Sequence, residues 1–391
     1  MMPGAADLWS EAPSISFLSE SGAKRRMKIK AAVLSGPGKK LAITELDLAE
    51  PRDQEVLVKI SACGVCHTDL WVQDYSRHYP IVLGHETSGI IEKTGKGVTG
   101  LQPGDPVVLS YTYCGECEAC RSGRTYECEH LYDFFEGLRL DGTSPRSLRG
   151  KPVAALIGQG GFAAYTVCHK NTVVKVDGGF DLQLLGPLGC GVLTGAGSVL
   201  NCLKPAKKKA IAIGGVGCVG LSALMAAKRS GCSPIIAIDR IPGRLEMAKE
   251  LGATHCINGD ETDISAEIKK FCGGVDYAFD TSGNRRLLDA LRIRLNPGAS
   301  ACGVGIGGSM NLSRKEKEQG KTWEDTTAGW SVPQKLIPRL LAWHKAGKFP
   351  FDRMIKVFPF DEINEAFEAN RSGSVIKPVV VIDRGYSSRA R

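Results

Sequence analysis

The sequence predicts an α/β protein with two domains, a β-barrel of short strands and a doubly wound parallel sheet. Three observations predict this fold class. The chain has 391 residues, more than one hydrophobic core usually organises. Its first part consists of short alternating segments interrupted by Gly and Pro, which is typical of a small irregular barrel. From residue 210 onwards, apolar strands alternate with helical segments, which is typical of a parallel sheet covered on both faces.

The barrel strands are expected early in the chain, where Val and Ile alternate with polar residues. The first expected strands are residues 27–34, 41–48 and 55–64. Residues 138–152, rich in Gly, Ser, Pro and Arg, are expected to form a surface loop. Residues 1–27 contain acidic side chains and no unbroken apolar core, so we expect a mostly disordered extension rather than a targeting signal.

The composition disfavours a nucleic-acid-binding protein and a membrane protein. The net charge of +8 is spread along the chain, so we expect a solvated basic surface and no nucleic-acid partner. No apolar run approaches the length of about 20 residues that a bilayer requires, so we expect no membrane segment. Fourteen cysteines without a secretion signal predict a cytoplasmic protein whose thiols bind metal or are buried.

One stretch concentrates the groups that a catalytic metal needs. Cys66 and His85 lie in the stretch CGVCHTDLWVQDYSRHYPIVLGHE, and Cys190 follows in LGCGVLTGAGS. Two thiolates and one imidazole would hold a zinc ion and leave a position open for substrate. Glu86 would ligate transiently or tune the ion, and Asp69 is the expected acceptor for the far ring nitrogen of His85. The competing interpretation is that these cysteines and this histidine are ordinary buried residues.

A second group of cysteines has the spacing of a closed metal site. Its members, spaced C-x2-C-x2-C-x7-C, are Cys114, Cys117, Cys120 and Cys128. Four thiolates complete a tetrahedral shell, which predicts a structural zinc. An iron–sulfur cluster is the competing metal, but no Pro follows the fourth cysteine and the chain has only one such group.

A glycine-rich turn follows the apolar strand expected at Ala210–Ile213. The glycines of this G-x-G-x-x-G turn are Gly215, Gly217 and Gly220. A helix is expected from about Cys218 to Arg229, and the next strand ends at Asp239. This context predicts a dinucleotide site: the glycines admit a pyrophosphate, and the acid binds the adenosine ribose. The alternative is a tight strand–helix turn without a ligand.

These motifs, taken together, resemble one family. From about Met27 to Asp383 the chain is similar to the zinc-dependent medium-chain alcohol dehydrogenases. The matching segments are GVCHTD, GHE, the four-cysteine lobe, LGCGVLTGAGS, IGGVGCVG and FDEINEAFEANRSGSVIKPVVVI. Within the family it most resembles the aryl-alcohol (benzyl-alcohol) branch, through LGCGVLTGAGSVLN, SVPQKLIPRLL and GKFPFD.

The resemblance implies the division into domains. A GroES-like catalytic domain would comprise residues 28–190 and 328–391, with a structural-zinc lobe at about 111–130. A Rossmann NAD-binding domain would comprise residues 191–327. The family forms dimers or tetramers through the edge of the Rossmann sheet, so the resemblance also implies a homodimer or homotetramer.

The resemblance further implies two zinc ions per chain and NAD(H). The catalytic zinc would be bound by Cys66, His85 and Cys190, and the four-cysteine lobe would bind the second ion. The residues implied to contact the alcohol proton or the cofactor are Thr68, Thr194, Val219, Arg244 and Lys377. Thr68 would take the proton of a small-molecule alcohol, and hydride would pass to the nicotinamide.

The chain departs from the family pattern at two places. Trp71 stands where many members have a proton-relaying His, and an indole cannot accept and pass on a proton. His67 is therefore a candidate shuttle, although the basic residue at this position often contacts the cofactor pyrophosphate. The segment Thr322–Thr327 replaces a Gly and aliphatic residues.

Three functions follow from these patterns. The first is an NAD-dependent zinc alcohol dehydrogenase acting on a primary aryl or allylic alcohol or the matching aldehyde. The second is a biosynthetic reductase of a polarised C=C or C=N bond, which the unusual Thr322–Thr327 segment favours. The third is a non-catalytic binding protein on the same fold, which the complete set of metal ligands disfavours.

Overall fold

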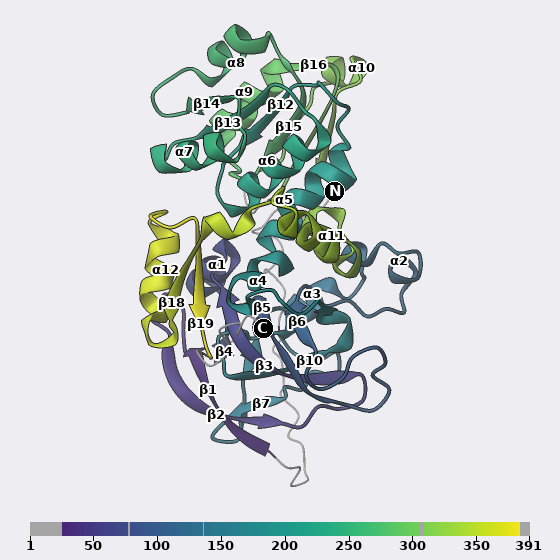
Figure 1. Ribbon diagram of the computed structural model, residues 1–391, viewed down its shortest axis with the longest axis vertical. Coiled ribbons are helices and arrows are strands. Elements are labelled where there is room, and N and C mark those ends of the chain that lie inside the picture. Colours follow the sequence, from purple (N-terminus) through teal and green to yellow (C-terminus); the bar gives the residue numbers. More distant parts are fainter. Residues whose placement is uncertain (1–25, 77–78, 136, 305–307, 384–391) are drawn as a thin grey trace. The chain divides into compact units, whose positions relative to one another are not determined.

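Two compact units make up the described chain. The computed structural model describes residues 26–76, 79–135, 137–304 and 308–383 (Figure 1). One unit contains Gly191–Ser331 and Leu340–Phe351. The other contains the described residues up to Cys190, together with Val332–Arg339 and residues 352–383.

The unit that begins at Gly191 is built on a six-stranded parallel sheet, as the alternation of strands and helices predicts (Figure 1). Its strands, in spatial order, are β14 (His255–Asn258), β13 (Ile235–Asp239), β12 (Ile211–Gly214), β15 (Val275–Asp280), β16 (Leu295–Gly303) and β17 (Thr322–Asp325). Its helices are α5 (Gly191–Gly197), η6 (Ser198–Leu203), α6 (Cys218–Ser230), α7 (Pro242–Leu251), α8 (Ile264–Cys272), α9 (Arg285–Arg294), α10 (Arg314–Glu318) and η7 (Ala328–Trp330). The doubly wound fold and the helix expected from Cys218 are therefore confirmed.

The central strand β12 marks the place where a ligand is expected. All four of its residues are buried, because it pairs in parallel with β13 on one side and β15 on the other. The chain adds strands outwards from β12 to β14 and then returns to β15 on the other side. The carboxyl ends of the strands beside such a reversal form a crevice that receives cofactors. The glycine-rich turn starts at this end of β12.

The other unit contains two mixed sheets of short strands, which accounts for the irregular barrel pattern. In spatial order the first sheet contains β8 (Lys151–Pro152), β7 (Arg146–Leu148), β2 (Ala42–Ala49), β1 (Arg26–Leu34), β4 (Ile81–Val82) and β9 (Ala154–Ala155). The second contains β11 (Val173–Lys175), β6 (Pro106–Leu109), β5 (Glu86–Thr94), β3 (Glu55–Gly64), β19 (Lys377–Val381) and β18 (Ile355–Pro359), with β10 (Tyr165–His169) also on β3. The helices are α1 (His67–Tyr75), α2 (Glu118–Arg121), η2 (Thr125–Glu127), α3 (Leu131–Phe135), η3 (Leu156–Gly158), η4 (Lys170–Thr172), α4 (Leu182–Leu185), η5 (Gly186–Gly189), η9 (Phe360–Glu362) and α12 (Ile363–Arg371). Two further helices are α11 (Pro333–Lys345) and η8 (Phe351–Met354).

Two expectations about this part of the chain need correction. The extension predicted over residues 1–27 lies outside the described residues except at its end, where β1 already begins at Arg26. The surface loop predicted over residues 138–152 contains the hairpin β7–β8, which pairs with β2. Arg146 in this hairpin is only 1% exposed, because its guanidinium donates to the carbonyl of Gln159 (2.6 Å) and to the hydroxyl of Thr166. A charged residue in a Gly- and Pro-rich segment gave no sign of burial, since its partners come from elsewhere in the chain.

Among the described residues, no single helix has the length and hydropathy needed to cross a membrane, and one bent helix pair, Leu182–Gly189 with Gly191–Leu203, passes that test on length and composition alone.

Candidate functional site

Strand β3 brings the first group of predicted residues together. In the antiparallel pair with β5, Gly64 lies opposite Glu86, next to His85. In the antiparallel pair with β19, the same Gly64 lies opposite Val379, two residues from Lys377. Since β3 ends at Gly64, Cys66 follows immediately beyond these two partners. The register of one strand thus collects groups from distant parts of the sequence.

The predicted catalytic ligands converge at the end of β3. One ligand atom from each of Cys66, His85, Glu86 and Cys190 lies within 4.8 Å of every other. Cys66 immediately precedes helix α1, and Cys190 lies between η5 and α5. The Thr68 hydroxyl lies 3.8 Å from the Cys66 sulfur, so the group predicted to take the alcohol proton is beside this cluster.

Asp69 fixes the backbone around this cluster. Its carboxylate is fully buried and accepts hydrogen bonds from the backbone N–H groups of Cys66 (2.9 Å) and Gly84 (2.8 Å). Its Oδ1 lies 3.4 Å from Nδ1 of His85. The acceptor that the sequence predicts is therefore adjacent to the imidazole, although neither ring nitrogen of His85 has a hydrogen-bond partner within the described part of the chain.

The donor atoms of this cluster fit a zinc ion. His85 is 2% exposed, and leaving buried ring nitrogens without partners is costly unless something else satisfies them. The hydrogen bond with Cys190 holds the pKa of Cys66 well below its usual range, although burial acts in the opposite direction. A half-buried cysteine with a lowered pKa, beside an unpartnered imidazole and a second cysteine, matches the donor set of catalytic zinc sites. Glu86 adds a carboxylate to the same group.

A buried ion pair that the sequence analysis did not foresee holds Glu86. Lys377 donates to a carboxylate oxygen of Glu86 (2.9 Å) and to the carbonyl of Val65 (3.0 Å). Lys377 is 3% exposed and Glu86 is fully buried, and burial raises the pKa of Glu86 to about 7 against the opposing charge of Lys377. The contact of Lys377 with the cofactor stays a prediction. No sequence pattern indicated this contact, because it depends on the pairing of the closing strand β19 with β3.

The Glu86 carboxylate is packed against glycines. A side chain at Gly64 would place its Cβ 2.3 Å from Oε2 of Glu86, and one at Gly186 would lie 2.2 Å from the backbone carbonyl of Glu86. Real Cβ atoms essentially never approach another heavy atom to under 3 Å, so Gly186 requires glycine because its neighbour is backbone, and a side chain at Gly64 would displace the Glu86 carboxylate. Strand β3, through Gly64, and helix η5, through Gly186, therefore both limit the space around Glu86.

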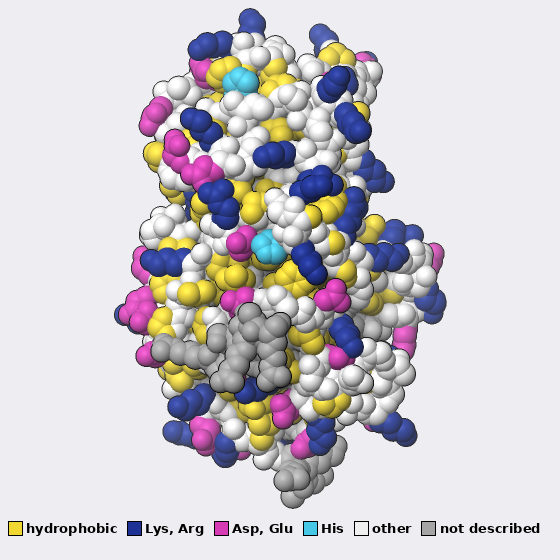
Figure 2. Space-filling model, viewed as in Figure 1, with side chains coloured by type: hydrophobic (Ala, Val, Ile, Leu, Met, Phe, Trp, Pro, Cys, Tyr) yellow, Lys and Arg dark blue, Asp and Glu magenta, His cyan; other side chains and the backbone are white. Residues whose placement is uncertain are grey.

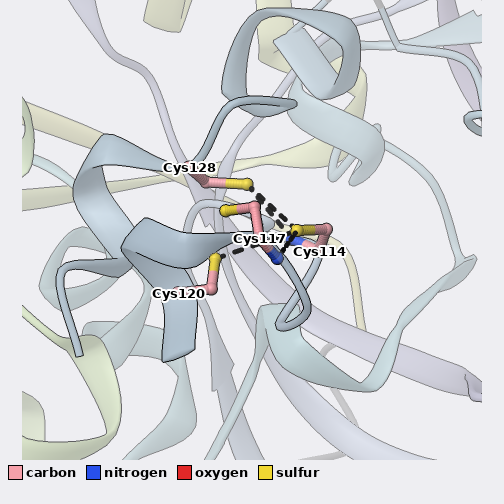
Figure 3. Close-up of side chains that lie close together, drawn as sticks. All are labelled: Cys114, Cys117, Cys120 and Cys128. Carbon is pink, nitrogen blue, oxygen red and sulfur yellow. Dashed lines mark hydrogen bonds between the residues drawn. The ribbon is translucent and has the colours of Figure 1, made fainter. Parts of the chain in front are cut away.

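The four cysteines of the second group also face one another (Figure 3). Their sulfur atoms all lie within 4.8 Å of one another, and Cys114 Sγ is 3.6 Å from that of Cys128 and 3.9 Å from that of Cys120. A tetrahedron with Zn–S bonds of about 2.3 Å has sulfur–sulfur edges of about 3.8 Å. The spacing therefore fits a single tetrahedral ion such as zinc. A cluster of several irons would hold sulfurs bound to different irons farther apart, so the iron–sulfur alternative is disfavoured.

The glycine-rich turn has the geometry of a ligand-binding turn. Gly215 has φ +77°, and a Cβ there would lie 2.5 Å from the Thr281 hydroxyl. A Cβ at Gly220 would lie 1.9 Å from the carbonyl of Gly215. At Gly217 the nearest heavy atom to such a Cβ is 3.8 Å away, on Arg244, so the backbone there is open to a close approach. Gly215 and Gly220 therefore have steric reasons to be glycine, whereas Gly217 has free space beside its backbone.

Asp239 lies at the end of β13, where the sequence predicts a ribose-binding acid. One carboxylate oxygen accepts from the N–H groups of Arg240 (2.8 Å) and Ile241 (3.0 Å), and the other accepts from Val216 (2.8 Å). Arg244 Nη1 lies 3.9 Å from the latter oxygen. The carboxylate therefore joins β13 to the glycine-rich turn and has a guanidinium at its side.

Thr194 and Val219, predicted to hold the nicotinamide, are brought close by helix packing. Thr194 lies in α5 and Val219 in the first turn of α6. A Cβ at Gly195 would lie 1.9 Å from the Val219 carbonyl, so the two helices touch through backbone at this point. The structure thus places both predicted residues around one helix contact.

The segment Thr322–Thr327, which departs from the family pattern, includes the edge strand β17 and is held by hydrogen bonds. Asp325 accepts hydrogen bonds from the indole of Trp323 (3.0 Å) and from the hydroxyl of Ser309 (2.7 Å). Thr326 is 8% exposed, and its hydroxyl lies 3.1 Å from that of Ser198. The polar residues of this segment therefore bind one another and their neighbours.

On the face drawn in Figure 2, Lys and Arg side chains are interspersed with acidic and uncharged ones across both units. This distribution agrees with the scattering of basic residues along the sequence.

Comparison with known proteins gives two family matches and close relatives. Residues 52–178 match the family described as alcohol dehydrogenase GroES-like domain, and residues 218–328 match zinc-binding dehydrogenase. A geraniol dehydrogenase from Castellaniella defragrans is 39% identical and aligns over 90% of this chain and 97% of that protein. An S-(hydroxymethyl)glutathione dehydrogenase from Escherichia coli is 34% identical over 90% of this chain and 100% of that protein.

Solved structures agree with these matches. Benzyl alcohol dehydrogenase from Acinetobacter calcoaceticus is 41% identical with a TM-score of 0.88, over 91% of this chain and 100% of that chain. An alcohol dehydrogenase zinc-binding domain protein from Burkholderia ambifaria is 38% identical with a TM-score of 0.89, over 92% of this chain and 100% of that chain.

Proposed function

Since the chain belongs to the zinc-dependent medium-chain alcohol dehydrogenase family, with a GroES-like and a Rossmann domain, we propose that it interconverts a primary aryl or allylic alcohol and the matching aldehyde with NAD(H). The observation that carries this proposal is the convergence of Cys66, His85 and Cys190, with the buried imidazole unpartnered by the described residues. A non-catalytic binding protein has no need to keep such a donor set.

The named relatives support the substrate class. Geraniol and benzyl alcohol both carry the hydroxyl on a carbon next to an unsaturated carbon, and proteins named for each are at least 39% identical to this chain. The relative named for S-(hydroxymethyl)glutathione also acts on a hydroxymethyl compound. None of these names supports the alternative of a reductase for polarised C=C or C=N bonds.

Two groups of side chains would hold two zinc ions. Cys66, His85 and Cys190 would bind the catalytic ion, with Glu86 beside them, and the four-cysteine lobe would bind the structural one. Bound at the first site, zinc supplies a Lewis acid that lowers the pKa of an alcohol. Asp69 would orient this site by holding the backbone of Cys66 and lying beside the His85 ring.

Thr68 is the residue proposed to take the alcohol proton. Its hydroxyl is 3.8 Å from Cys66 Sγ, and a hydroxyl accepts one proton while it donates another. His67, exposed at the start of α1, is the proposed neighbour, either as the next group to receive the proton or as a contact for the cofactor pyrophosphate. Trp71 offers no acceptor for this path.

The cofactor is proposed to be NAD(H), bound at the glycine-rich turn. Gly215, Gly217 and Gly220 would admit the pyrophosphate, and Asp239 would bind the adenosine ribose. The other proposed cofactor contacts are Thr194, Val219, Arg244 and Lys377. A carboxylate at position 239 repels a 2′-phosphate, which favours NAD over NADP.

The catalytic domain would comprise residues 28–190 and 328–391, and the cofactor domain 191–327. We propose a homodimer or homotetramer, because β17 is an edge strand of its sheet, and edge strands are available for pairing. None of the fourteen cysteines, all of which the structure describes, forms a disulfide, which supports the cytoplasm as the proposed compartment.

The test is a substrate screen followed by the absorbance of the nicotinamide. We expect geraniol and benzyl alcohol to be oxidised with NAD, and the purified protein to contain two zinc ions per chain. A matched saturated alcohol serves as the comparison substrate. Reduction of a conjugated C=C bond without any alcohol oxidation would favour the reductase, and a protein without zinc and without turnover would favour the binding protein.

A further inference from the structure

The segment that leads into the four-cysteine lobe is held by a turn from another part of the chain. Asn171 lies in η4 and donates through its side-chain Nδ2 to the carbonyl of Tyr113 (2.9 Å), the residue before Cys114. Next to it, the hydroxyls of Thr172 and Thr112 are 2.6 Å apart. Two side chains of η4 therefore hold the two residues that precede Cys114.

The contact of Asn171 with the lobe is close. Gly115 has φ +83°, and a Cβ there would lie 2.9 Å from the Asn171 amide nitrogen. The amide thus lies over the residue that follows Cys114 while it binds the carbonyl that precedes it. Gly115 adopts this left-handed conformation without strain because it has no Cβ, and the same lack of a Cβ lets the Asn171 amide pack closely against it.

This turn determines which hydrogen bonds the sulfur of Cys114 accepts. Cys114 Sγ accepts hydrogen bonds from the backbone N–H groups of Glu116 (3.4 Å) and Cys117 (3.3 Å), and the N–H of Cys114 donates to Cys128 Sγ (3.3 Å). N–H donors stabilise the thiolate form that binds metal. If the turn opened, both donors and the direction of the Cys114 side chain would change.

Asn171 is itself fixed in place. Its backbone N–H donates to Nδ1 of His169 (3.2 Å), and its carbonyl accepts from the side chain of Gln334 (3.0 Å) in α11. The backbone N–H of Lys170 donates to the carbonyl of Gln54 (2.8 Å). The amide is thus presented by a rigid turn and loses little freedom when it binds the Tyr113 carbonyl.

We propose that Asn171 is a positioning residue for the structural metal site, holding the turn at Tyr113–Gly115 so that Cys114 faces the other three cysteines with its sulfur already hydrogen-bonded. This proposal rests on the proposed occupancy of the lobe by zinc. Asn171 does not ligate the ion; it acts through the backbone on either side of Cys114. Removing its amide loosens the turn and speeds the loss of metal from the lobe.

The experiment compares Asn171→Ala and Asn171→Asp with the unmutated protein. Asn171→Asp keeps the size of the side chain but replaces the donor with an oxygen that faces the Tyr113 carbonyl. The first readout is the rate at which zinc passes to an excess of a chelating dye. The second is deuterium uptake by peptides covering residues 113–130, measured also after metal removal, which needs neither activity nor metal.

The matched control is Asn364→Ala. Asn364 likewise binds backbone through its side-chain amide, accepting from the N–H of Leu41 (2.9 Å) and donating to its carbonyl (3.0 Å), in the same unit but outside the lobe. We expect both Asn171 variants to release one zinc per chain about fivefold faster, as the loss of one hydrogen bond implies, and to take up deuterium faster at residues 113–130. The control should change neither quantity.

The outcomes separate this proposal from the function on which it rests. Unchanged zinc release and unchanged uptake at residues 113–130 in Asn171→Asp would overturn the positioning role, and so would equal changes in Asn364→Ala. An unmutated protein without zinc would contradict the proposed metal content. Faster deuterium uptake at residues 113–130 in the metal-free Asn171 variants would still support the role of Asn171 in holding the turn.

Discussion

At the scale of single residues, the candidate catalytic cluster contains a carboxylate held by a buried lysine. Glu86 and Lys377 are both almost without solvent exposure, and their contact is supported by the carbonyl of Val65. A buried pair adds little net stability over apolar residues, but removing one partner leaves a charge that water cannot reach. The pair is therefore sensitive to single substitutions.

Lys377→Met should lower the free energy of unfolding by about 3–5 kcal/mol, because the Glu86 carboxylate loses its counter-charge in a buried site. Urea denaturation followed by circular dichroism measures this. The double variant with Glu86→Gln removes both charges and should recover most of the loss. If Lys377→Met unfolds at the same urea concentration as the unmutated protein, the buried ion pair is not formed.

The second residue-scale prediction concerns cofactor choice. Asp239→Asn keeps the shape of the side chain but removes the charge that opposes a 2′-phosphate, so the ratio of kcat/KM for NAD to that for NADP should fall by about tenfold or more. Arg240→Ala serves as the comparison, because it removes the neighbouring positive charge and should raise that ratio. An unmutated protein that uses NADP as well as NAD would show that Arg240 or Arg244 dominates.

At the scale of elements, the helix contact between α5 and α6 determines where Thr194 and Val219 lie. The contact includes backbone, since a Cβ at Gly195 would lie 1.9 Å from the Val219 carbonyl. Small residues let helices approach in this way, and any added atom must push the helices apart.

Gly195→Ala should therefore lower the free energy of unfolding by about 1–3 kcal/mol and weaken NAD binding, as the two helices separate. Thermal melting and titration with NAD measure the two effects. Gly243→Ala is the matched control: it also lies in a helix, α7, and a Cβ there meets no heavy atom within 4 Å. This control should leave stability unchanged or raise it by up to about 1 kcal/mol. Equal behaviour of the two variants would contradict the close helix contact.

At the scale of the whole molecule, the proposed structural zinc would link stability to metal content. A four-thiolate site contributes folding free energy, because the unfolded chain does not offer the same preformed shell. Cys120 is 8% exposed and cannot be replaced without leaving the shell incomplete.

Cys120→Ser should reduce the zinc content from two ions per chain to one and lower the melting temperature. Metal analysis and calorimetry measure both quantities. Cys256→Ser is the control for the chemistry of the substitution, because this half-buried cysteine of β14 belongs to neither cysteine group. Full zinc content with unchanged melting in Cys120→Ser would contradict the structural site.

Much of the molecule could be predicted because its signals are local. The glycine-rich turn, the acid at the end of the next strand and the four-cysteine spacing each lie within a short stretch of sequence. The fold class and the parallel sheet follow from the period of the apolar residues, which reports the burial of each element directly. Cys66, His85 and Cys190 were also identifiable, since their motifs are distinctive even though Cys190 is distant in sequence.

Tertiary structure alone decided which polar side chains are buried and what they bind. The partner of Glu86 depends on β3 pairing with both β5 and β19, and the burial of Arg146 depends on Gln159 and Thr166. Asn171 appears in the sequence as an ordinary turn residue, and only the folded chain brings its amide to Tyr113. Apolar burial repeats along a chain and leaves a pattern, whereas a buried polar contact joins two single residues at an arbitrary separation and leaves none.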